Sequence, residues 1–242
     1  MAVLTCENIK KSFGAKEVLK GVSLELNEGE LVSLLGVSGG GKTTLFNVLS
    51  GIYMPEEGRV TLRGEDITGK PGKISYMLQK DLLLPYKKVI DNVSLPLVLR
   101  GMSKREARQK ADGHFASFGL EGTQQLYPSA LSGGMRQRAA LLRTYLASDG
   151  VALLDEPFSA LDTITKSRIH EWYLDVMNEI NLSTIFITHD IDEAILLSDR
   201  ICILTDGRIT NELHIEAPKP RAKDFNLTPE FLEYKKQIVN ML

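Results

Sequence analysis

The chain of 242 residues is 43% hydrophobic and 25% charged, and its formal net charge is −2. This composition is typical of a soluble globular protein, and the near balance of charge argues against nucleic acid as a partner, because nucleic-acid-binding domains usually carry a basic face. No segment approaches the roughly 20 apolar residues that span a bilayer, and Glu7 interrupts the N-terminus before any stretch that would resemble a secretory signal; we therefore expect a cytosolic chain.

The first 30 residues show the alternation of half-buried strands. Val22, Leu24 and Leu26 would share one face, with Ser23 and Glu25 on the other. A period of two residues is that of a β-strand with one face in the core. We therefore predict antiparallel strands in this region.

Continuous apolar runs follow, at residues 31–35, 151–154, 185–187 and 201–204. Such runs are typical of strands that are buried on both faces of a parallel sheet. The predicted fold class is α/β, with a mainly parallel core sheet and an antiparallel β edge. Cys6 and Cys202 lie inside strand-like runs without a CxxC or histidine neighbour, so we expect buried hydrophobic cysteines rather than redox or metal sites.

Helical signals replace strand signals between about residues 87 and 146. Ser103 and Glu106 form a capping box, followed by apolar positions at helical spacing: Ala107, Ala111, Phe115 and Phe118. A further helix is predicted at residues 164–180, with Trp172 in its packed stripe. The sequence therefore predicts a helical insertion between two core strands.

The C-terminal part begins with a tight hairpin turn predicted at residues 205–208, Thr-Asp-Gly-Arg. Residues 217–242 are expected to form a short linker and a terminal helix that begins at Thr228 and Pro229. One apolar face of this helix is formed by Phe231, Tyr234, Ile238 and Met241. We expect that face to dock on the rest of the chain; the alternative is a partner or a lipid surface.

A phosphate-binding loop is predicted between the strand at 31–35 and a helix at 42–50. The pattern G-x-x-x-x-G-K-T lets backbone N–H groups approach phosphates, while the lysine reaches the β and γ phosphates and the threonine coordinates Mg²⁺. The expected ATP-binding residues are Gly36, Ser38, Gly39, Gly40, Gly41, Lys42, Thr43 and Thr44. A glycine-rich turn without a ligand is the alternative, and the Lys-Thr pair in register disfavours it.

Two acids end the apolar run at 151–154. A carboxylate after a second buried strand is what a P-loop needs to hold its metal, so Asp155 is predicted as a Mg²⁺ residue. Glu156 would orient the attacking water or accept its proton. A merely charged strand end before Pro157 is the alternative, and the P-loop disfavours it.

Residues 131–138, Leu-Ser-Gly-Gly-Met-Arg-Gln-Arg, discriminate between classes of P-loop protein. Ser132 and two glycines open a helix and create a second anion-binding N-terminus. At this point the chain resembles the nucleotide-binding subunit of ATP-binding cassette (ABC) transporters, whose signature motif begins Leu-Ser-Gly-Gly. The resemblance implies an ABC ATPase domain at residues 1–216, in which residues 87–146 form a helical signature subdomain.

The resemblance also implies a homodimer in which the signature of one subunit contacts ATP on the P-loop of the other. ATP contacts in trans are implied for Ser132, Gly133, Gly134 and, in the D-loop, Asp162. Gln79 resembles the Q-loop glutamine that contacts Mg²⁺ and water, and His189 resembles the switch histidine; both are implied to be catalytic. Phe13 is at the position of the aromatic ring that stacks on adenine.

One departure concerns Met135, which replaces the glutamine that often follows Leu-Ser-Gly-Gly. The motif is similar to that of importers of nitrate, sulfonate, taurine and related small organic solutes, and of compatible-solute importers. The latter commonly carry a long C-terminal extension, so the 26 residues after Glu216 favour the former group. The resemblance then implies an ATPase that powers import of such a solute.

The partners implied by the resemblance are ATP with Mg²⁺, integral-membrane permease subunits and, indirectly, an extracellular or periplasmic solute-binding protein. Residues 81–86 resemble the stretch that meets the membrane partner, so the chain is expected to be peripheral at the cytoplasmic face of the membrane. Alternatives are a non-transport ABC ATPase acting on DNA or ribosomes and a P-loop kinase. A single cassette without heptads disfavours the former, and residues 131–138 disfavour the latter.

Overall fold

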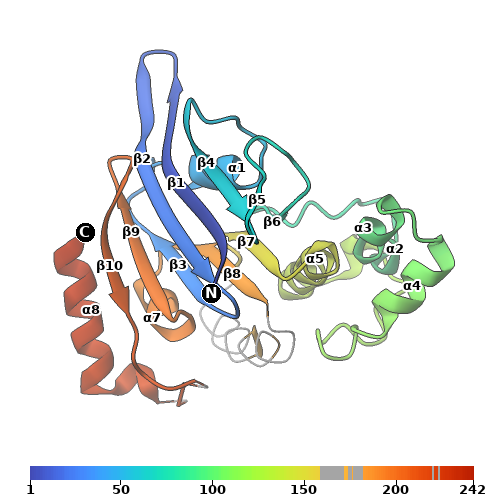
Figure 1. Cartoon of the computed structure of the whole chain (residues 1–242). Helices are drawn as coiled ribbons and strands as arrows, with labels where there is room; N and C mark the ends of the chain where they lie inside the picture. The colour runs from blue at the N-terminus through green and yellow to red at the C-terminus, as the bar shows by residue number, and fades with distance from the viewer. Residues whose placement is uncertain (159–171, 174–175, 177–181, 220, 223) are drawn as a thin grey trace.

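The computed structural model describes residues 1–158, 172–173, 176, 182–219, 221–222 and 224–242. Within these ranges the strands form two sheets (Figure 1). The first is antiparallel, has the order β2-β1-β4-β5, and consists of β1 (Ala2–Phe13), β2 (Lys16–Asn27), β4 (Glu57–Leu62) and β5 (Glu65–Asp66). The predicted antiparallel pairing near the N-terminus is confirmed.

The second sheet has the order β10-β9-β3-β8-β7-β6. Its parallel strands are β3 (Leu31–Leu35), β6 (Ser75–Met77), β7 (Val151–Asp155), β8 (Ser183–Ile187) and β9 (Arg200–Thr205). The antiparallel edge is β10 (Arg208–His214). The predicted α/β class is confirmed, with one refinement: the N-terminal strands build a separate sheet instead of extending the core sheet.

Both faces of the parallel sheet are covered, which explains its continuous apolar runs. In β3, Val32 and Leu34 pack toward the antiparallel sheet and α1 (Lys42–Leu49), while Leu31 packs among residues of the helical region on the opposite side. The same alternation divides β7 and β8 between the two cores. A strand with apolar neighbours on both faces has no position at which a polar side chain would be solvated.

The region between β6 and β7 is helical, as predicted. Its elements are α2 (Val89–Val93), α3 (Leu95–Leu99), α4 (Lys104–Asp112), η1 (Pro128–Ala130) and α5 (Gly133–Ala147), and they extend to one side of the sheets (Figure 1). The hydroxyl of Ser103 caps α4 by accepting a hydrogen bond from the N–H of Glu106, 3.3 Å away. This confirms the capping box.

The predicted continuation of α4 through Phe118 is wrong, because the helix ends at Asp112 and turns follow Gly113. Phe118 is nevertheless fully buried, with its ring centroid 5.6 Å from that of Trp172. The spacing of the apolar residues therefore predicted their burial correctly, but it did not predict the length of the helix. Trp172 packs in the core as predicted, while most of the helix expected at residues 164–180 lies outside the described residues.

The C-terminal elements are α7 (Ile191–Leu197), η2 (Phe225–Leu227) and α8 (Pro229–Met241), and the hairpin turn at Asp206 and Gly207 is confirmed. The hydroxyl of Thr228 caps α8, as predicted. The predicted apolar face of α8 packs against α7 and β10, so the expected docking is confirmed. Lys235 of α8 also pairs with Asp192 in the first turn of α7, at 2.6 Å.

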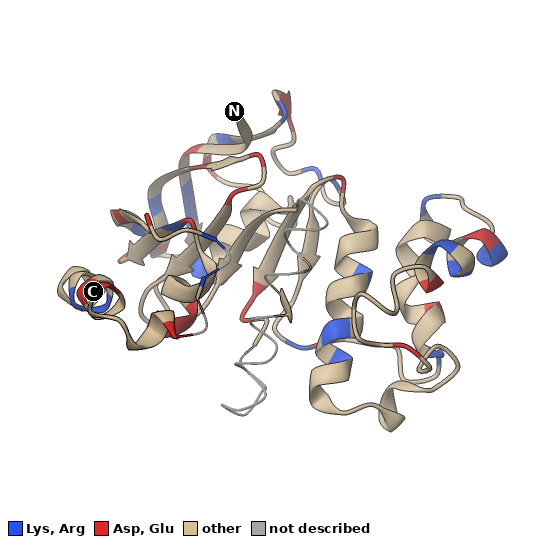
Figure 2. Cartoon of the chain, turned by 90° about the horizontal axis from the view of Figure 1, so that it is seen from below, with Lys and Arg blue, Asp and Glu red and all other residues tan. Residues whose placement is uncertain are grey.

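Cys6 and Cys202 are buried, as expected. Lys and Arg are interspersed with Asp and Glu along both the sheets and the helical region (Figure 2). In the part of the chain that the structure describes, no helix combines the length and the apolar character that a bilayer span requires.

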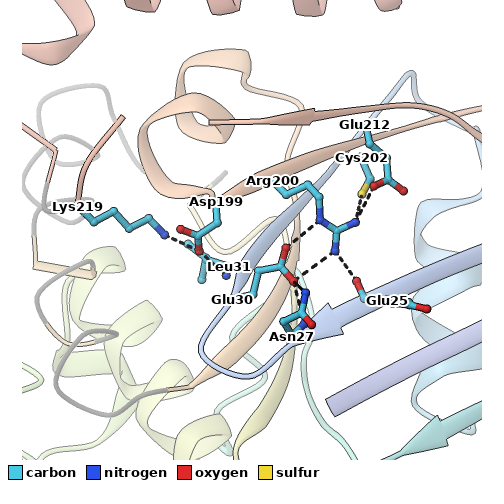
Figure 3. Close-up of polar contacts among 9 residues, drawn as sticks. All are labelled: Glu25, Asn27, Glu30, Leu31, Asp199, Arg200, Cys202, Glu212 and Lys219. Atoms are coloured by element: carbon cyan, nitrogen blue, oxygen red, sulfur yellow. Dashed lines mark hydrogen bonds and ion pairs between the residues drawn. The ribbon is translucent and has the colours of Figure 1, made fainter. Parts of the chain in front are cut away.

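Arg200 at the start of β9 links three strands across the edge of the core (Figure 3). Its guanidinium, 7% exposed as a side chain, donates to Glu30 at 2.8 Å, to Glu212 at 2.8 Å and to the carbonyl oxygen of Glu25 at 2.5 Å. Burial acts to raise the pKa of Glu30, but the hydrogen bonds and charge of Arg200 and the bonds from Asn27 outweigh it, so the pKa is lowered. The ionised form of Glu30 thus stabilises the fold.

We predict that Glu30→Gln lowers the free energy of unfolding by about 2 kcal/mol at pH 7, because a charge-assisted pair is lost. A carboxyl whose pKa is lowered by folding contributes fully above its unfolded value of 4.5, and that contribution disappears as the pH falls through the lower folded value. Urea unfolding from pH 7 to pH 3.5 measures both effects. Glu212→Gln, at the 41% exposed partner of Arg200, is the control and should cost less than about 1 kcal/mol; equal losses at all pH values would contradict the prediction.

Candidate functional site

A cleft of about 330 Å³ opens at the carboxyl ends of β3 and β8. Its lining includes most of the residues predicted for the P-loop. It also includes Glu156 and His189, which are far from the P-loop in the sequence. The complete lining consists of Lys16, Val18, Ser38, Gly39, Gly41, Lys42, Thr43, Thr44, Glu156, Ile187 and His189. The carboxyl edge of a parallel sheet is where ligands of open α/β folds bind.

The loop between β3 and α1 requires glycine for two separate reasons. Gly36 has φ 151°, and a Cβ atom there would lie 2.1 Å from the carbonyl oxygen of Leu204. Gly41, the N-cap of α1, has φ 102°, in the left-handed region that favours glycine. The loop therefore passes close to β9 and turns directly into α1, whose first residues line the cleft.

Lys42 places a buried cation inside this loop. Its ammonium donates to the carbonyl oxygens of Gly36 at 2.8 Å and Val37 at 2.9 Å. Burial lowers the pKa of Lys42, and the negative charges of Glu156 and Asp155 act against that shift. Positive charge and the N-terminal dipole of α1 thus coincide at one end of the cleft, which favours an anion there.

Asp155 ends β7, which is separated from β3 by β8 in the sheet, and its side chain contacts Thr43 of α1. One oxygen of its carboxylate, Oδ2, accepts hydrogen bonds from the hydroxyl of Thr43 at 3.3 Å and from the hydroxyl of Tyr76 at 3.4 Å. Asp155 is only 6% exposed. Burial and the neighbouring charge of Glu156 raise its pKa, partly offset by the two hydroxyls and by Lys42.

These groups fit a Mg²⁺ ion that is shared with a bound nucleotide. Thr43 and Asp155 are hard oxygen donors, which Mg²⁺ prefers, and Mg²⁺ typically uses one or two protein oxygens together with substrate phosphates and water. Among the described residues no group of three or more His, Cys, Asp or Glu side chains is arranged to hold a metal by itself. The donor set therefore suits a metal that arrives with phosphate.

Glu156 leaves β7 in an unusual conformation, with φ 47°, which is uncommon for a residue other than glycine. Its N–H donates to the carbonyl oxygen of Ile187, 3.0 Å away. Its two carboxylate oxygens take separate partners: Oε1 lies 2.7 Å from Nε2 of His189, and Oε2 accepts from the amide of Gln79 at 2.8 Å. Glu156 thus has different hydrogen-bond partners from Asp155, although the two residues are adjacent.

His189 is held by the turn between β8 and α7. Asp190 caps α7, because its carboxylate accepts from the N–H groups of Asp192 and Glu193, and its own N–H donates to the hydroxyl of Thr188 at 3.0 Å. The hydroxyl of Thr188 donates in turn to the carboxylate of Glu193 at 2.6 Å. This local network presents the imidazole, 41% exposed as a side chain, to Glu156.

Three residues expected to contact ATP in trans, Ser132, Gly133 and Gly134, are not among the residues that line the cleft. Ser132 caps α5 by accepting from the N–H of Met135, and both Ser132 and Gly133 are exposed. Gly133 instead borders a separate hollow of about 710 Å³, whose lining also contains Gln79 and residues 80–83. Asp162 lies outside the described residues.

Two observations concern Phe13 and the strand that follows it. Phe13 does not line the cleft; its ring is 47% exposed and packs edge-on against Tyr53, with centroids 5.5 Å apart. Lys16 and Val18 of β2 line the cleft, and sequence analysis missed both. The sequence could have indicated them only by their position, because they follow Phe13 directly after the β1–β2 turn.

Residues 19–159 match the family described as ABC transporter. This chain belongs to that family. It is 38% identical to the formylaminopyrimidine import ATP-binding protein ThiZ of Halalkalibacterium halodurans, over 98% of this chain and 93% of ThiZ. It is 37% identical to the aliphatic sulfonates import ATP-binding protein SsuB of Corynebacterium glutamicum, over 98% of this chain and 93% of SsuB. It is 35% identical to the nitrate import ATP-binding protein NrtD of Synechocystis, over 95% of this chain and 89% of NrtD.

Solved structures agree with this membership. A dimeric bacterial ABC transporter cassette, MJ0796, superposes with a TM-score of 0.77 at 30% identity, over 88% of this chain and 99% of that chain. CbiO1 of Clostridium perfringens superposes with a TM-score of 0.82 at 25% identity, over 98% and 99% of the two chains. The resemblance to ABC ATPases and to the nitrate and sulfonate importer group is therefore confirmed, and the chain is an ABC-type ATPase.

We predict that Asp155→Asn raises the unfolding free energy of the nucleotide-free protein by on the order of 1 kcal/mol, since it removes a buried charge that lies next to the carboxylate of Glu156. The amide oxygen can still accept from Thr43. Thermal unfolding without nucleotide measures the effect, and the pKa direction predicts that the gain is largest at neutral pH and vanishes in acid, where Asp155 is protonated. A lower melting temperature at pH 7 would contradict the burial argument.

Proposed function

We propose that this chain is the ATP-hydrolysing subunit of a membrane importer for a small solute of the nitrate, sulfonate or taurine type, or a related organic compound. The observation that carries the proposal is the convergence of Gln79 and His189 on the two carboxylate oxygens of Glu156, beside the P-loop. The import function rests on the relatives, which are named as import ATP-binding proteins for formylaminopyrimidine, sulfonates and nitrate. None of those names favours DNA or ribosomes as the substrate.

In the proposed site, ATP lies along the P-loop. The N–H groups of residues 36–44 and Lys42 bind the phosphates, with Thr43, Asp155 and Gln79 as the residues for Mg²⁺. The bound metal would supply charge neutralisation at the β and γ phosphates. Phe13, exposed at the end of β1, is proposed to stack on adenine; its exposure and the position of Lys16 and Val18 in the cleft support this.

Glu156 is proposed to accept a proton from the water that attacks the γ phosphorus, while the bond to the bridging oxygen breaks and ADP leaves. A carboxylate is suited to this role when neighbouring donors orient it. Gln79 and His189 hold both oxygens of Glu156 in place, and His189 is proposed to contact the γ phosphate as well. The left-handed backbone at Glu156 supports the assignment, because strained residues cluster at active sites.

A second copy of the chain is proposed to complete each ATP site through Ser132, Gly133, Gly134 and Asp162. The exposure of Ser132 and Gly133 at the N-terminus of α5 supports this arrangement, as does the dimeric form of the related cassette. ATP would then bind the closed dimer better than the open one, and this difference in affinity drives the closure. Residues 1–216 are proposed as the ATPase domain, with the helical subdomain at 87–146.

The remaining partners are integral-membrane permease subunits and, indirectly, an extracellular or periplasmic solute-binding protein. The hollow lined by residues 79–83 and the start of α5 supports a contact with the permease. The chain is proposed to act at the cytoplasmic face of the membrane.

Glu156→Gln tests the assignment of the base. We expect the variant to bind ATP with near-parental affinity but to hydrolyse it at least about 100-fold more slowly, because the amide cannot accept the proton. ATP should then hold the variant as a dimer, measured by light scattering during size-exclusion chromatography, with phosphate release as the rate assay.

Glu121→Gln is the matched control, because Glu121 is exposed in the turn after Leu120. It should keep the parental rate. Hydrolysis by Glu156→Gln at the parental rate would overturn the role of Glu156, and copurification with ribosomes or DNA instead of a polytopic membrane protein would overturn the transport proposal.

A further inference from the structure

Tyr76 contributes a hydrogen bond that no part of the proposed chemistry uses. Its hydroxyl lies 3.4 Å from Oδ2 of Asp155, the oxygen that also accepts from Thr43 at 3.3 Å. Asp155 is almost fully buried, so these two hydroxyls replace water as its hydrogen-bond donors. Such a partner determines how the carboxylate is rotated about its side-chain bonds.

Two neighbours hold the ring of Tyr76. In β6 the residue is opposite Leu153 of β7, two positions before Asp155. Its ring also packs edge-on against Phe46 of α1, with centroids 5.8 Å apart and planes at 81°. The phenol is therefore fixed relative both to the strand that carries Asp155 and to the helix that carries Thr43.

The chemistry of the phenol suits a carboxylate whose charge must remain available. A phenol is neutral and protonated near pH 7, so the hydroxyl of Tyr76 donates to Oδ2 of Asp155. A lysine or arginine in its place would stabilise Asp155 too, but its positive charge would repel a metal cation. A neutral hydroxyl orients the carboxylate and leaves its negative charge intact.

We propose that Tyr76 is a positioning residue for the metal site, which acts by holding Oδ2 of Asp155 beside Thr43. This inference rests on the proposed role of Asp155 toward Mg²⁺. Hydrogen-bond partners of metal-binding carboxylates commonly affect metal affinity by 10- to 100-fold. Tyr76 is not among the residues that line the nucleotide cleft, so its effect should appear in metal affinity rather than in nucleotide binding.

Tyr76→Phe tests the proposal, because it removes the hydroxyl and keeps the ring. We expect the Mg²⁺ concentration for half-maximal ATP hydrolysis to rise about 10-fold, while kcat at saturating Mg²⁺ stays within about twofold of the parent. A second readout does not depend on turnover: electron paramagnetic resonance of Mn²⁺ titrated into the full-length protein with ADP should show a similar loss of Mn²⁺ affinity. Thermal unfolding without metal checks that the variant is folded.

Tyr127→Phe is the matched control, since Tyr127 is 48% exposed before η1, and it should leave both readouts unchanged. Asp155→Asn distinguishes the role of Tyr76 from the metal role of Asp155. If Asp155→Asn weakens Mn²⁺ binding and Tyr76→Phe does not, the role of Tyr76 is overturned alone. If Asp155→Asn leaves Mn²⁺ binding unchanged, the proposed metal role of Asp155 fails. A loss of kcat in Tyr76→Phe with unchanged Mn²⁺ affinity would also overturn the inference.

Discussion

Asp155 and Glu156 place two negative charges on adjacent residues at the end of a buried strand, where water screens them poorly. Different donors hold the two carboxylates. Glu156 contacts Gln79 and His189, while Asp155 accepts from Thr43 and Tyr76. Side chains from α1, from β6 and from the end of β8 therefore contact the carboxylates of Asp155 and Glu156. The order of strands in the parallel sheet brings these side chains together.

The same sheet edge brings groups of both charges to the cleft. Lys42 and the start of α1 supply positive charge, and Glu156 supplies a carboxylate in the same lining. An anion such as a phosphate chain is attracted to the positive groups, whereas a metal cation and a water molecule suit carboxylate oxygens. The cleft therefore combines a site for anions with an oxygen donor for a cation.

The P-loop, the acid pair and the buried strands could be predicted from the sequence because each is encoded within a few consecutive residues. Gly36 and Gly41 belong to one short motif, and a run such as that at 151–154 reports burial on two faces. The family followed from residues 131–138, and the comparisons confirm it. The capped starts of α4 and α8 were equally local.

The contacts that assemble the site could not be predicted in the same way. Gln79 and Glu156 meet across 77 positions because β6 pairs with β7 in one register, and apolar runs do not specify which strands pair. Lys16 lines the cleft because β2 belongs to a separate antiparallel sheet, and the sequence pattern did not distinguish that sheet from an edge of the core sheet. The early end of α4 was missed because apolar residues in turns can be as buried as those in a helix.

The docking of α8 on α7 affects the support of His189 through a short series of contacts. Lys235 pairs with Asp192, whose N–H donates to the carboxylate of Asp190, the residue next to His189. The last helix and the imidazole therefore share one support, the first turn of α7. A change that loosens α8 far from the cleft would relax the geometry of the histidine before it disturbs the P-loop, so the two halves of the site differ in their sensitivity to the C-terminal region.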